Sequence, residues 1–228
     1  MDPSSSPSSR GWDKRASVLE QRAFVDQLSR NPATESGELE VVARLVTESC
    51  AQLVGVERAG VWLFDETETE LRCVDQFTRS DGRHTSGTVL REHEFRSELQ
   101  VLKTSLYVDA SEPLTDPRTA GYVGSYLEAN HITSMLDVVI RFGGKNLGTL
   151  CFEHVDQAHT WEQHEIDFGC MIGAQLSVLL ERRALRQTDV ARREALERLR
   201  ATQELDALKN RFLANISHEF RTPLTLLL

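Results

Sequence analysis

The chain has 228 residues, of which 40% are hydrophobic, and its formal charge is −9 at neutral pH. This length accommodates one mid-sized domain with extensions, and the acidic balance argues against general affinity for nucleic acids, which bind basic surfaces. The sequence has no apolar run near the roughly 18 residues of a membrane-spanning helix and no N-terminal signal peptide, so we expect a cytoplasmic protein without a membrane segment.

The N-terminal part changes from a low-complexity segment to helices. Residues 1–16 are rich in serine and proline, a composition typical of disorder. A first helix is predicted over residues 17–29, and the sequence NPAT at residues 31–34 interrupts the helical pattern. A second helix is predicted over residues 38–53, because apolar residues recur there at helical spacing on one face. These residues are Leu39, Val42, Leu45, Val46 and Leu53.

The periodicity then changes to that of strands. Residues 58–65 and 71–78 are predicted strands, and the polar turn between them makes the pair a β-hairpin. A short helix over residues 92–103 and a short strand over residues 106–109 follow. Residues 111–124 form a predicted loop that holds two prolines and two glycines.

A second hairpin is predicted from residues 134–142 and 147–155. Its connection contains Gly143 and Gly144, which permit the positive φ of a tight turn. From residue 161 the pattern is helical almost to the end. This element order predicts an α+β fold, with an antiparallel sheet flanked by helices and followed by a long C-terminal helix.

A recognisable motif runs from residue 134 to residue 176. It reads S-x-L-x-V-x-I, then a glycine turn, then G-x-L-x-x-x-H and W-x-x-x-E-x-x-F, and it resembles the C-terminal half of a GAF domain. The fitting residues are Ser134, Leu136, Val138, Ile140, Gly148, Leu150, His154, Trp161, Glu165 and Phe168. The proline usual in this pattern is Val139 here. The resemblance covers about residues 17–183 and implies a GAF-like module that senses a small molecule or another signal.

The resemblance leaves the GAF ligand unknown. Candidates to line a sensory pocket are His131, Cys151, Tyr122, Tyr126, Asp137 and Arg141. Ordinary surface or packing roles are the alternative for the last four. The chain has no Cys-His pair of the kind found in chromophore-binding relatives, which argues against bilin attachment. The N-K-F-D-E signature of cyclic-nucleotide-binding relatives is not recognisable either.

The cysteines and the remaining histidines give weak signals. The four cysteines avoid C-x-x-C spacing and lie in apolar segments, so reduced thiols in or near a core are expected. His154, His159 and His164 are spaced as H-x4-H-x4-H across a loop and a helix start, and metal ligands there would have to converge. We expect no metal site. A redox or metal sensor that uses Cys151 and nearby histidines is kept as an alternative hypothesis.

The helical stretch over residues 184–211 has no glycine or proline and is dense in Arg, Glu, Leu and Ala. Its leucines continue through Phe212 to Ile216 as a narrow apolar stripe, as in a coiled-coil seam, with offsets that resemble stutters. A single helix exposing this stripe would gain little burial, whereas pairing with an identical helix would cover it. We therefore expect a parallel homodimer through this signalling helix.

Residues 212–228 read FLANISHEFRTPLTLLL and carry the strongest signal of the chain. His218 is followed at once by Glu219, and an imidazole beside a carboxylate can act as a nucleophile because the carboxylate takes the ring proton. The stretch resembles the phosphoacceptor box of sensor histidine kinases, F-[LM]-A-x-[IVM]-S-H-E-[LFI]-R-T-P-L. The fitting residues are Phe212, Leu213, Ala214, Ile216, Ser217, His218, Glu219, Phe220, Arg221, Thr222, Pro223 and Leu224.

The second resemblance implies ATP-dependent autophosphorylation on His218, with Glu219 as proton acceptor and Thr222 helping to place water for phosphatase activity. It also implies phosphotransfer to an aspartate in the receiver domain of a response regulator. The ATP-binding boxes of the family are absent from the sequence. ATP and Mg²⁺ would therefore be held by a catalytic domain outside this chain, which itself binds neither.

Residues 212–228 are then the start of a dimerisation and phosphoacceptor domain that is truncated at Leu228, and we expect the chain to be a fragment of a longer product. The alternative from another class is a non-catalytic GAF module that binds a ligand and dimerises. In that case the phosphoacceptor box would be a relic, and dimerisation would be indifferent to His218.

Overall fold

The computed structural model describes the backbone of residues 7–225 and the side chains of residues 18–213, 215 and 216. The chain divides into two compact units, Met1–Arg183 and Ala184–Leu228. The helices are α1 (Pro7–Ser29), α2 (Pro32–Ser36), α3 (Leu39–Val54), α4 (Arg96–Thr104), the 3₁₀ helix η1 (Pro117–Tyr122), the π-helix η2 (Val123–Leu127) and α5 (Gln163–Thr225). The strands are β1 (Arg58–Phe64), β2 (Glu70–Thr78), β3 (Arg83–Thr85), β4 (Val89–Arg91), β5 (Tyr107–Ala110), β6 (Ile132–Phe142) and β7 (Lys145–Val155).

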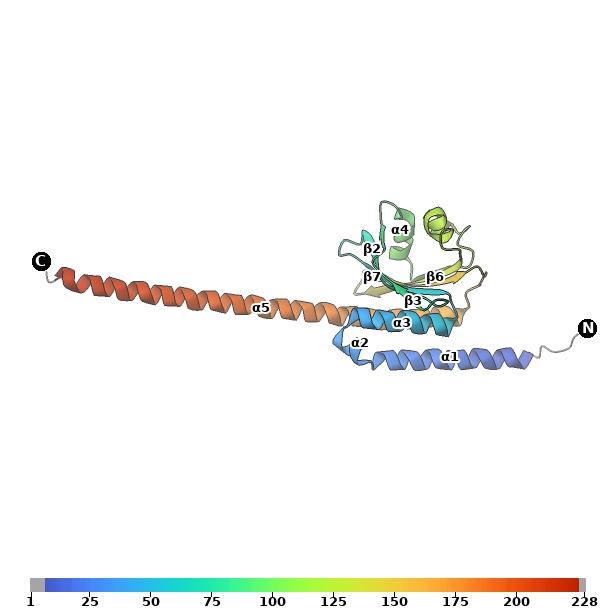
Figure 1. Ribbon diagram of the computed structural model, residues 1–228, viewed down its shortest axis with the longest axis horizontal. Helices are drawn as coiled ribbons and strands as arrows, with labels where there is room; N and C mark the ends of the chain where they lie inside the picture. The colour runs from blue at the N-terminus through green and yellow to red at the C-terminus, as the bar shows by residue number, and fades with distance from the viewer. Residues whose placement is uncertain (1–6, 226–228) are drawn as a thin grey trace, which may run out of the picture. The chain divides into compact units, whose positions relative to one another are not determined.

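One antiparallel sheet forms the centre of the first unit (Figure 1). Its strands follow the order β3-β2-β1-β7-β6-β5, and β4 pairs with β2. Both predicted hairpins are present, since β1 pairs with β2 and β6 pairs with β7. β1 also pairs with β7, which joins the two hairpins into one sheet. The predicted α+β class, an antiparallel sheet flanked by helices and followed by a long helix, is confirmed.

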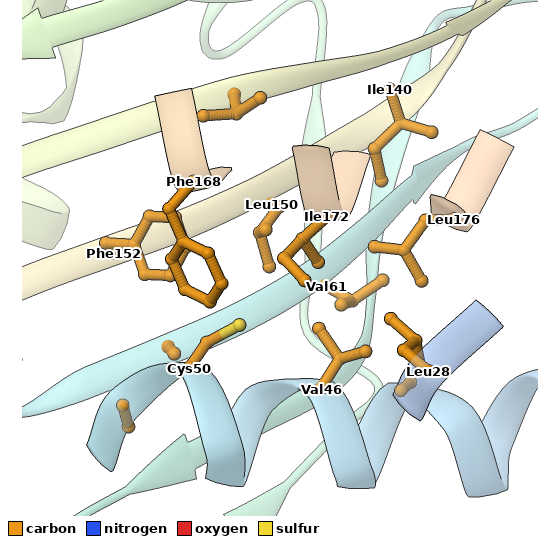
Figure 2. Packing of buried hydrophobic residues seen from close by; sticks show 14 of the residues in the cluster. Leu28, Val46, Cys50, Val61, Ile140, Leu150, Phe152, Phe168, Ile172 and Leu176 are labelled. Carbon is orange, nitrogen blue, oxygen red and sulfur yellow. The ribbon is translucent and has the colours of Figure 1, made fainter. Parts of the chain in front are cut away.

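The main core lies on the face of the sheet that α3 and the first part of α5 cover, and α1 packs against α3 on its outer side. Alternate side chains of a strand point to the same face, so every second residue of β1, β6 and β7 enters this core. Figure 2 shows how they meet the helices; the labelled residues are Leu28, Val46, Cys50, Val61, Ile140, Leu150, Phe152, Phe168, Ile172 and Leu176. Full burial of an aliphatic or aromatic side chain contributes about 1.5–3 kcal/mol, so this layer dominates the stability of the unit.

A β-bulge in β2 changes which residues face this core. Val61 pairs with Asp75 and Trp62 pairs with Cys73, so Val74 is the extra residue. Without a bulge, Cys73 and Asp75 would lie on the same face of the sheet, because side chains alternate with a period of two. With it, Cys73 belongs to the cluster on the far face, whereas Asp75 accepts a hydrogen bond from Thr47 of α3. The bulge thus gives β2 an inward-facing carboxylate on the helix side.

The opposite face of the sheet is covered by α4, η1 and η2. Trp62 and Leu71 pack there against Leu102 of α4, and Met135 packs with Leu127 of η2. Because both faces are covered, polar side chains on the central strands are buried and need partners inside the protein. This second face holds the cavity described below.

Glycines in α5 allow that helix to lie close to β6. A Cβ atom at Gly169 would lie 2.8 Å from Val138 Cγ2 and 3.1 Å from Phe152 Cε2. A Cβ atom at Gly173 would lie 3.3 Å from Val138 Cγ1. The core is already close-packed, so the first position has no room for a methyl group and the second has little.

The structure differs from the sequence-based boundaries at several points. Disorder was expected over residues 1–16, but α1 begins at Pro7, where proline suits the first turn of a helix; residues 1–6 lie outside the described residues. The predicted break after α1 contains α2, whose first turn is capped by the Asn31 side chain accepting from Ala33 N–H. The predicted loop over residues 111–124 contains η1 and the first two residues of η2. β3 and β4 are too short to leave a periodic pattern in the sequence.

Helix α5 continues from the first unit through the second and ends at Thr225. Its part in the second unit is dense in charged residues, as predicted. Within residues 7–225 no helix combines the length and apolar character that crossing a membrane requires.

The close approach of α5 predicts that Gly169→Ala destabilises the protein even though alanine favours helices by about 1 kcal/mol over glycine. Overpacking of a core costs about 1–3 kcal/mol, so we expect a net loss of unfolding free energy of about 1 kcal/mol. Urea denaturation of the full chain measures it. Gly173→Ala is the matched control and should be near neutral. Val138→Ala should relieve the overpacking at Gly169→Ala, so additive effects of the two substitutions would contradict the packing argument.

Candidate functional site

A cavity of about 20 Å³ lies between the sheet and the segments that cover its second face. A cavity of this size holds on the order of one water molecule. Its lining residues come from every covering segment and from five strands; they are Trp62, Leu71, Leu90, Leu102, Tyr122, Tyr126, Met135, Asp137, Thr149 and Cys151. An apolar pocket with a few convergent polar groups is the usual form of a small-molecule site.

Asp137 is the carboxyl group of this pocket. It lies on β6 opposite Cys151 of β7 and is 5% exposed. Burial raises the pKa of Asp137 to about 7, and the nearby Glu153 carboxylate acts in the same direction, whereas the hydrogen bond with the Cys151 thiol opposes them. Asp137 therefore changes its charge near neutral pH, unlike an ordinary surface carboxylate.

Glu153 organises the polar groups beside the pocket. It is 1% exposed and accepts hydrogen bonds from the Tyr126 hydroxyl (2.6 Å) and from Gln76 Nε2 (3.3 Å). Arg58 Nε forms an ion pair with it at 3.2 Å, and the Cys151 thiol donates to it at 3.5 Å. Tyr126 belongs to η2, so this carboxylate ties the covering segment to the sheet. The donors satisfy both carboxylate oxygens, as a buried charge requires.

A second buried carboxylate holds the covering segments together. Glu98 of α4 is 2% exposed and accepts from Gly121 N–H of η1 at 2.6 Å and from the Ser97 hydroxyl at 2.9 Å. A Cβ atom at Gly121 would lie 2.5 Å from Glu98 Oε2, so only glycine allows the backbone to come this close. Glu98 therefore fixes η1 against α4.

None of the four cysteines has the features of a reactive thiol. All are free, and burial raises the pKa of each; for Cys73 it reaches about 12. For Cys151, in the pocket, the Asp137 and Glu153 carboxylates add to the effect of burial. The thiolate is the reactive form, and it is disfavoured at every position. These environments speak against the redox-sensor hypothesis.

Of the three histidines singled out as a metal alternative, His154 and His159 lie together, whereas His164 does not join them. The rings of His154 and His159 stack with centroids 4.3 Å apart, and His159 Nε2 lies 2.9 Å from Glu165 Oε2. Burial lowers the pKa of His154 to about 4, with a further contribution from His159. His164 instead lies 3.5 Å from Glu162. In the described part of the chain, no group of three or more His, Cys, Asp or Glu side chains is arranged to hold a metal ion.

Glu165 has a structural role in this region. Its carboxylate accepts from Glu162 N–H at 2.8 Å, just before the first residue of α5, as in a capping box. Trp161 is 7% exposed and lies edge-on to His159, with ring centroids 5.0 Å apart. The W-x-x-x-E part of the motif thus fixes the start of α5 beside the end of β7.

The structure brings together most, but not all, of the residues expected at a pocket. Cys151, Asp137, Tyr122 and Tyr126 line the cavity. His131 does not: its side chain is 74% exposed and lies 3.6 Å from Asp156. Arg141 does not either, because it donates to Asn146 and to the carbonyls of Lys103 and Ser105 at the edge of the sheet.

Sequence reasoning missed Glu153, Glu98 and Trp62. Alternation gave a signal for Glu153, which lies two residues after Cys151 on the same strand and therefore on the same face. For Glu98 the helical spacing with Leu99 and Leu102 indicated only an amphipathic helix. The sequence therefore indicated the pocket strands without indicating how their charges are paired.

The residues of the phosphoacceptor box lie near the end of α5. The backbone of His218, Glu219 and Thr222 belongs to this helix. Their side chains lie outside the described residues, so the structure gives no geometry for this part of the predicted site.

A comparison with protein families agrees with the fold. The model of the GAF domain family matches residues 38–180, which is more than half of the chain. The chain therefore belongs to the GAF domain family. The match includes α3, the whole sheet, its covering segments and the first part of α5.

Two curated relatives are histidine kinases by name. The circadian input-output histidine kinase CikA of Thermosynechococcus vestitus is 26% identical over 232 residues, covering 91% of this chain and 32% of that protein. The CikA protein of Synechococcus elongatus is 30% identical over 117 residues, covering 44% of this chain and 15% of that protein. The chain thus spans about a third or less of the length of these relatives.

Solved structures share the fold at low sequence identity. The phycocyanobilin-bound GAF domain of a cyanobacterial phytochrome has a TM-score of 0.61 and 17% identity, covering 73% of this chain and 96% of that one. The GAF domain of a phosphoenolpyruvate-protein phosphotransferase from Coxiella burnetii has a TM-score of 0.58 and 14% identity, covering 75% and 96%. At such identities the likeness concerns the fold alone.

The raised pKa of Asp137 predicts a pH-dependent stability. Between about pH 4 and about pH 7 the folded state binds the Asp137 proton more tightly than the unfolded state, so stability contributed by this group falls as pH rises through that window. Asp137→Asn removes the titration. The unfolding free energy of Asp137→Asn minus that of the native chain should therefore rise by about 1.4 kcal/mol per pH unit within this window. The difference should level off above about pH 7.

Chemical denaturation at several pH values measures this difference. Asp156→Asn, at an exposed position, is the matched control and should show no such trend. Glu153, Cys151 and Tyr122 also face Asp137, and they remain unchanged in the comparison. A difference between Asp137→Asn and the native chain that is constant with pH would contradict the assignment.

Proposed function

We propose that the chain is the sensory and phosphoacceptor portion of a two-component sensor histidine kinase. A small molecule in the GAF pocket is the signal, and α5 connects the pocket to His218. The observation that carries the proposal is that the box FLANISHEFRTPL follows the GAF domain on the same continuous helix. The names of the relatives support it, because the alignment with one histidine kinase covers 91% of the chain.

His218 is the proposed acceptor of the phosphoryl group. One ring nitrogen attacks the γ-phosphorus of ATP, the bond between that phosphorus and the oxygen leaving with ADP breaks, and Glu219 takes the proton of the ring. Positioning and charge stabilisation supply most of the rate in such transfers, so ATP and Mg²⁺ must be held by a catalytic domain that this chain does not supply.

The phosphoryl group then passes to an aspartate in the receiver domain of a response regulator. Thr222 lies four residues after His218 and therefore on the same side of the helix, where it helps to place water for phosphatase activity, which is hydrolysis and releases inorganic phosphate. All these steps take place in the cytoplasm in this proposal.

A homodimer through the second unit is part of the proposal. Large apolar side chains are exposed along this part of α5; they are Leu185, Val190, Leu196, Leu199, Leu205, Leu208 and Phe212. Met171 and Val178 of the first unit are also exposed and lie fourteen and seven residues, respectively, before Leu185. A spacing of seven is that of a coiled-coil seam, and an identical parallel helix covers such a seam.

Substitution of the acceptor histidine tests the proposed activity. With the ATP-binding domain of a histidine kinase supplied in trans and radiolabelled ATP, the full chain should become labelled. His218→Gln should abolish the label, because the glutamine amide is not a nucleophile at phosphorus. His93→Gln, at an exposed position of the first unit, is the matched control and should keep it. Label that survives His218→Gln would reject His218, and an unlabelled but ligand-responsive dimer would favour the non-catalytic module.

Charge placed on the seam tests the dimer. Leu208→Lys should shift the chain from dimer to monomer and raise the dimer dissociation constant by about tenfold or more, because a coiled-coil core strongly disfavours a buried charge. Ala207→Lys adds the same charge beside the seam and should leave the dimer intact. Sedimentation equilibrium of the two variants measures the difference. Equal behaviour of the two would show that the stripe does not pair.

A further inference from the structure

The pocket has more buried negative charge than positive charge. Asp137 lines the cavity, and Glu153 and Glu98 lie close behind it, all at most 5% exposed. Arg58, whose side chain is 14% exposed, is the cation of this interior, and Glu153 engages it at 3.2 Å. Among the side chains that the structure describes, neither Asp137 nor Glu98 forms an ion pair.

Asp137 and Glu98 differ in the hydrogen-bond donors that compensate their buried charge. Glu98 accepts from the Gly121 backbone and from Ser97. Asp137 has the weakly donating Cys151 thiol, which Glu153 shares. Buried carboxylates are normally paired with a cation or several good donors. The Asp137 carboxylate, which faces the cavity, is therefore the one that lacks sufficient hydrogen-bond donors or a cation.

Aromatic rings surround the same cavity. Trp62 comes from the sheet, and Tyr122 and Tyr126 come from the covering segments, with their two ring centroids 6.0 Å apart. The faces of aromatic rings attract cations, and aromatic cages are a common way to hold an ammonium group. Three rings with a carboxylate favour a ligand that is positively charged at one end and apolar at the other. An anionic ligand would meet repulsion from Asp137, Glu153 and Glu98.

We propose that the pocket binds a small organic cation: a primary ammonium on a short apolar or aromatic body. The ammonium lies against the Asp137 carboxylate, and the body lies among the rings of Trp62, Tyr122 and Tyr126. This proposal rests on the proposed sensory function of the same pocket and names the class of its ligand.

The size of the cavity adds a conformational requirement. A space of about 20 Å³ accepts one water-sized group, so a body larger than a methyl group must displace η1 or η2. Two hydrogen bonds oppose this displacement: Tyr126 to Glu153 and Gly121 to Glu98, both 2.6 Å long. Binding is therefore coupled to movement of the covering segments, and a larger body produces a larger movement.

Calorimetric titration of the full chain with matched probes tests the charge requirement. Phenethylamine should bind, whereas phenethyl alcohol, of similar shape, and hydrocinnamate, an anion, should bind at least about tenfold more weakly. Asp137→Asn should weaken phenethylamine binding by about tenfold or more and leave phenethyl alcohol unchanged. Asp156→Asn, an exposed carboxylate of the same type, should change neither.

The pH dependence gives an independent readout. A bound ammonium holds Asp137 ionised, so phenethylamine affinity should rise by roughly tenfold from about pH 6 to about pH 8, where the amine stays protonated. Asp137→Asn should remove this rise. Glu153, Glu98, Cys151, Tyr122 and Arg58 face the pocket from the other elements and are present in both proteins.

Equal affinity for the amine and the alcohol, retained amine binding in Asp137→Asn, or absence of amine binding would each overturn the proposal. The comparison of probes on the native chain stands even if Asp137→Asn fails to fold. Labelling of His218 is measured separately, so failure of amine binding leaves the phosphoacceptor proposal intact, and failure of labelling leaves the pocket proposal intact.

Discussion

The carboxylate of Glu153 is the group on which the pocket side of the fold depends. It sits on a central strand that is covered on both faces, and it engages donors from β1, β2, β7 and η2. Removal of one donor would leave part of a buried charge unpaired, which costs more than the lost hydrogen bond is worth. The segment over the cavity is thus held by electrostatics as well as by apolar packing.

Burial of both faces of the sheet also explains why its two sides differ in character. The face with α3 and α5 carries mostly large apolar side chains and is close-packed. The other face combines the polar residues Asp137, Thr149 and Glu153 with Trp62 and Leu71, and it contains a cavity. The Val74 bulge lets β2 serve both faces, giving Asp75 to the helices and Cys73 to the pocket side. One sheet therefore combines a close-packed side with a side that contains a cavity.

Much of this architecture could be predicted from local sequence. The hairpins of β1 with β2 and of β6 with β7 follow from strand periodicity and from Gly143 and Gly144, because hairpin pairing is a local event. The bulge at Val74 and the short strands β3 and β4 could not be predicted, since they depend on pairing geometry. At the pocket, Asp137 and Cys151 were visible as polar or thiol residues in apolar strands. The role of Glu153 was not, because its partners Gln76 and Tyr126 lie 77 and 27 residues away in the chain.

The alternation of β6 has a mechanical consequence. Asp137 faces the cavity, and the next residue, Val138, faces Gly169 and Gly173 of α5. Because those glycines carry no side chain, the valine methyls rest almost directly on the helix backbone. A shift of β6 on the cavity side would therefore reach α5 across a single peptide unit. For the proposed sensory function the sheet itself is the transducer, because only this thin contact separates the pocket strand from the backbone of α5.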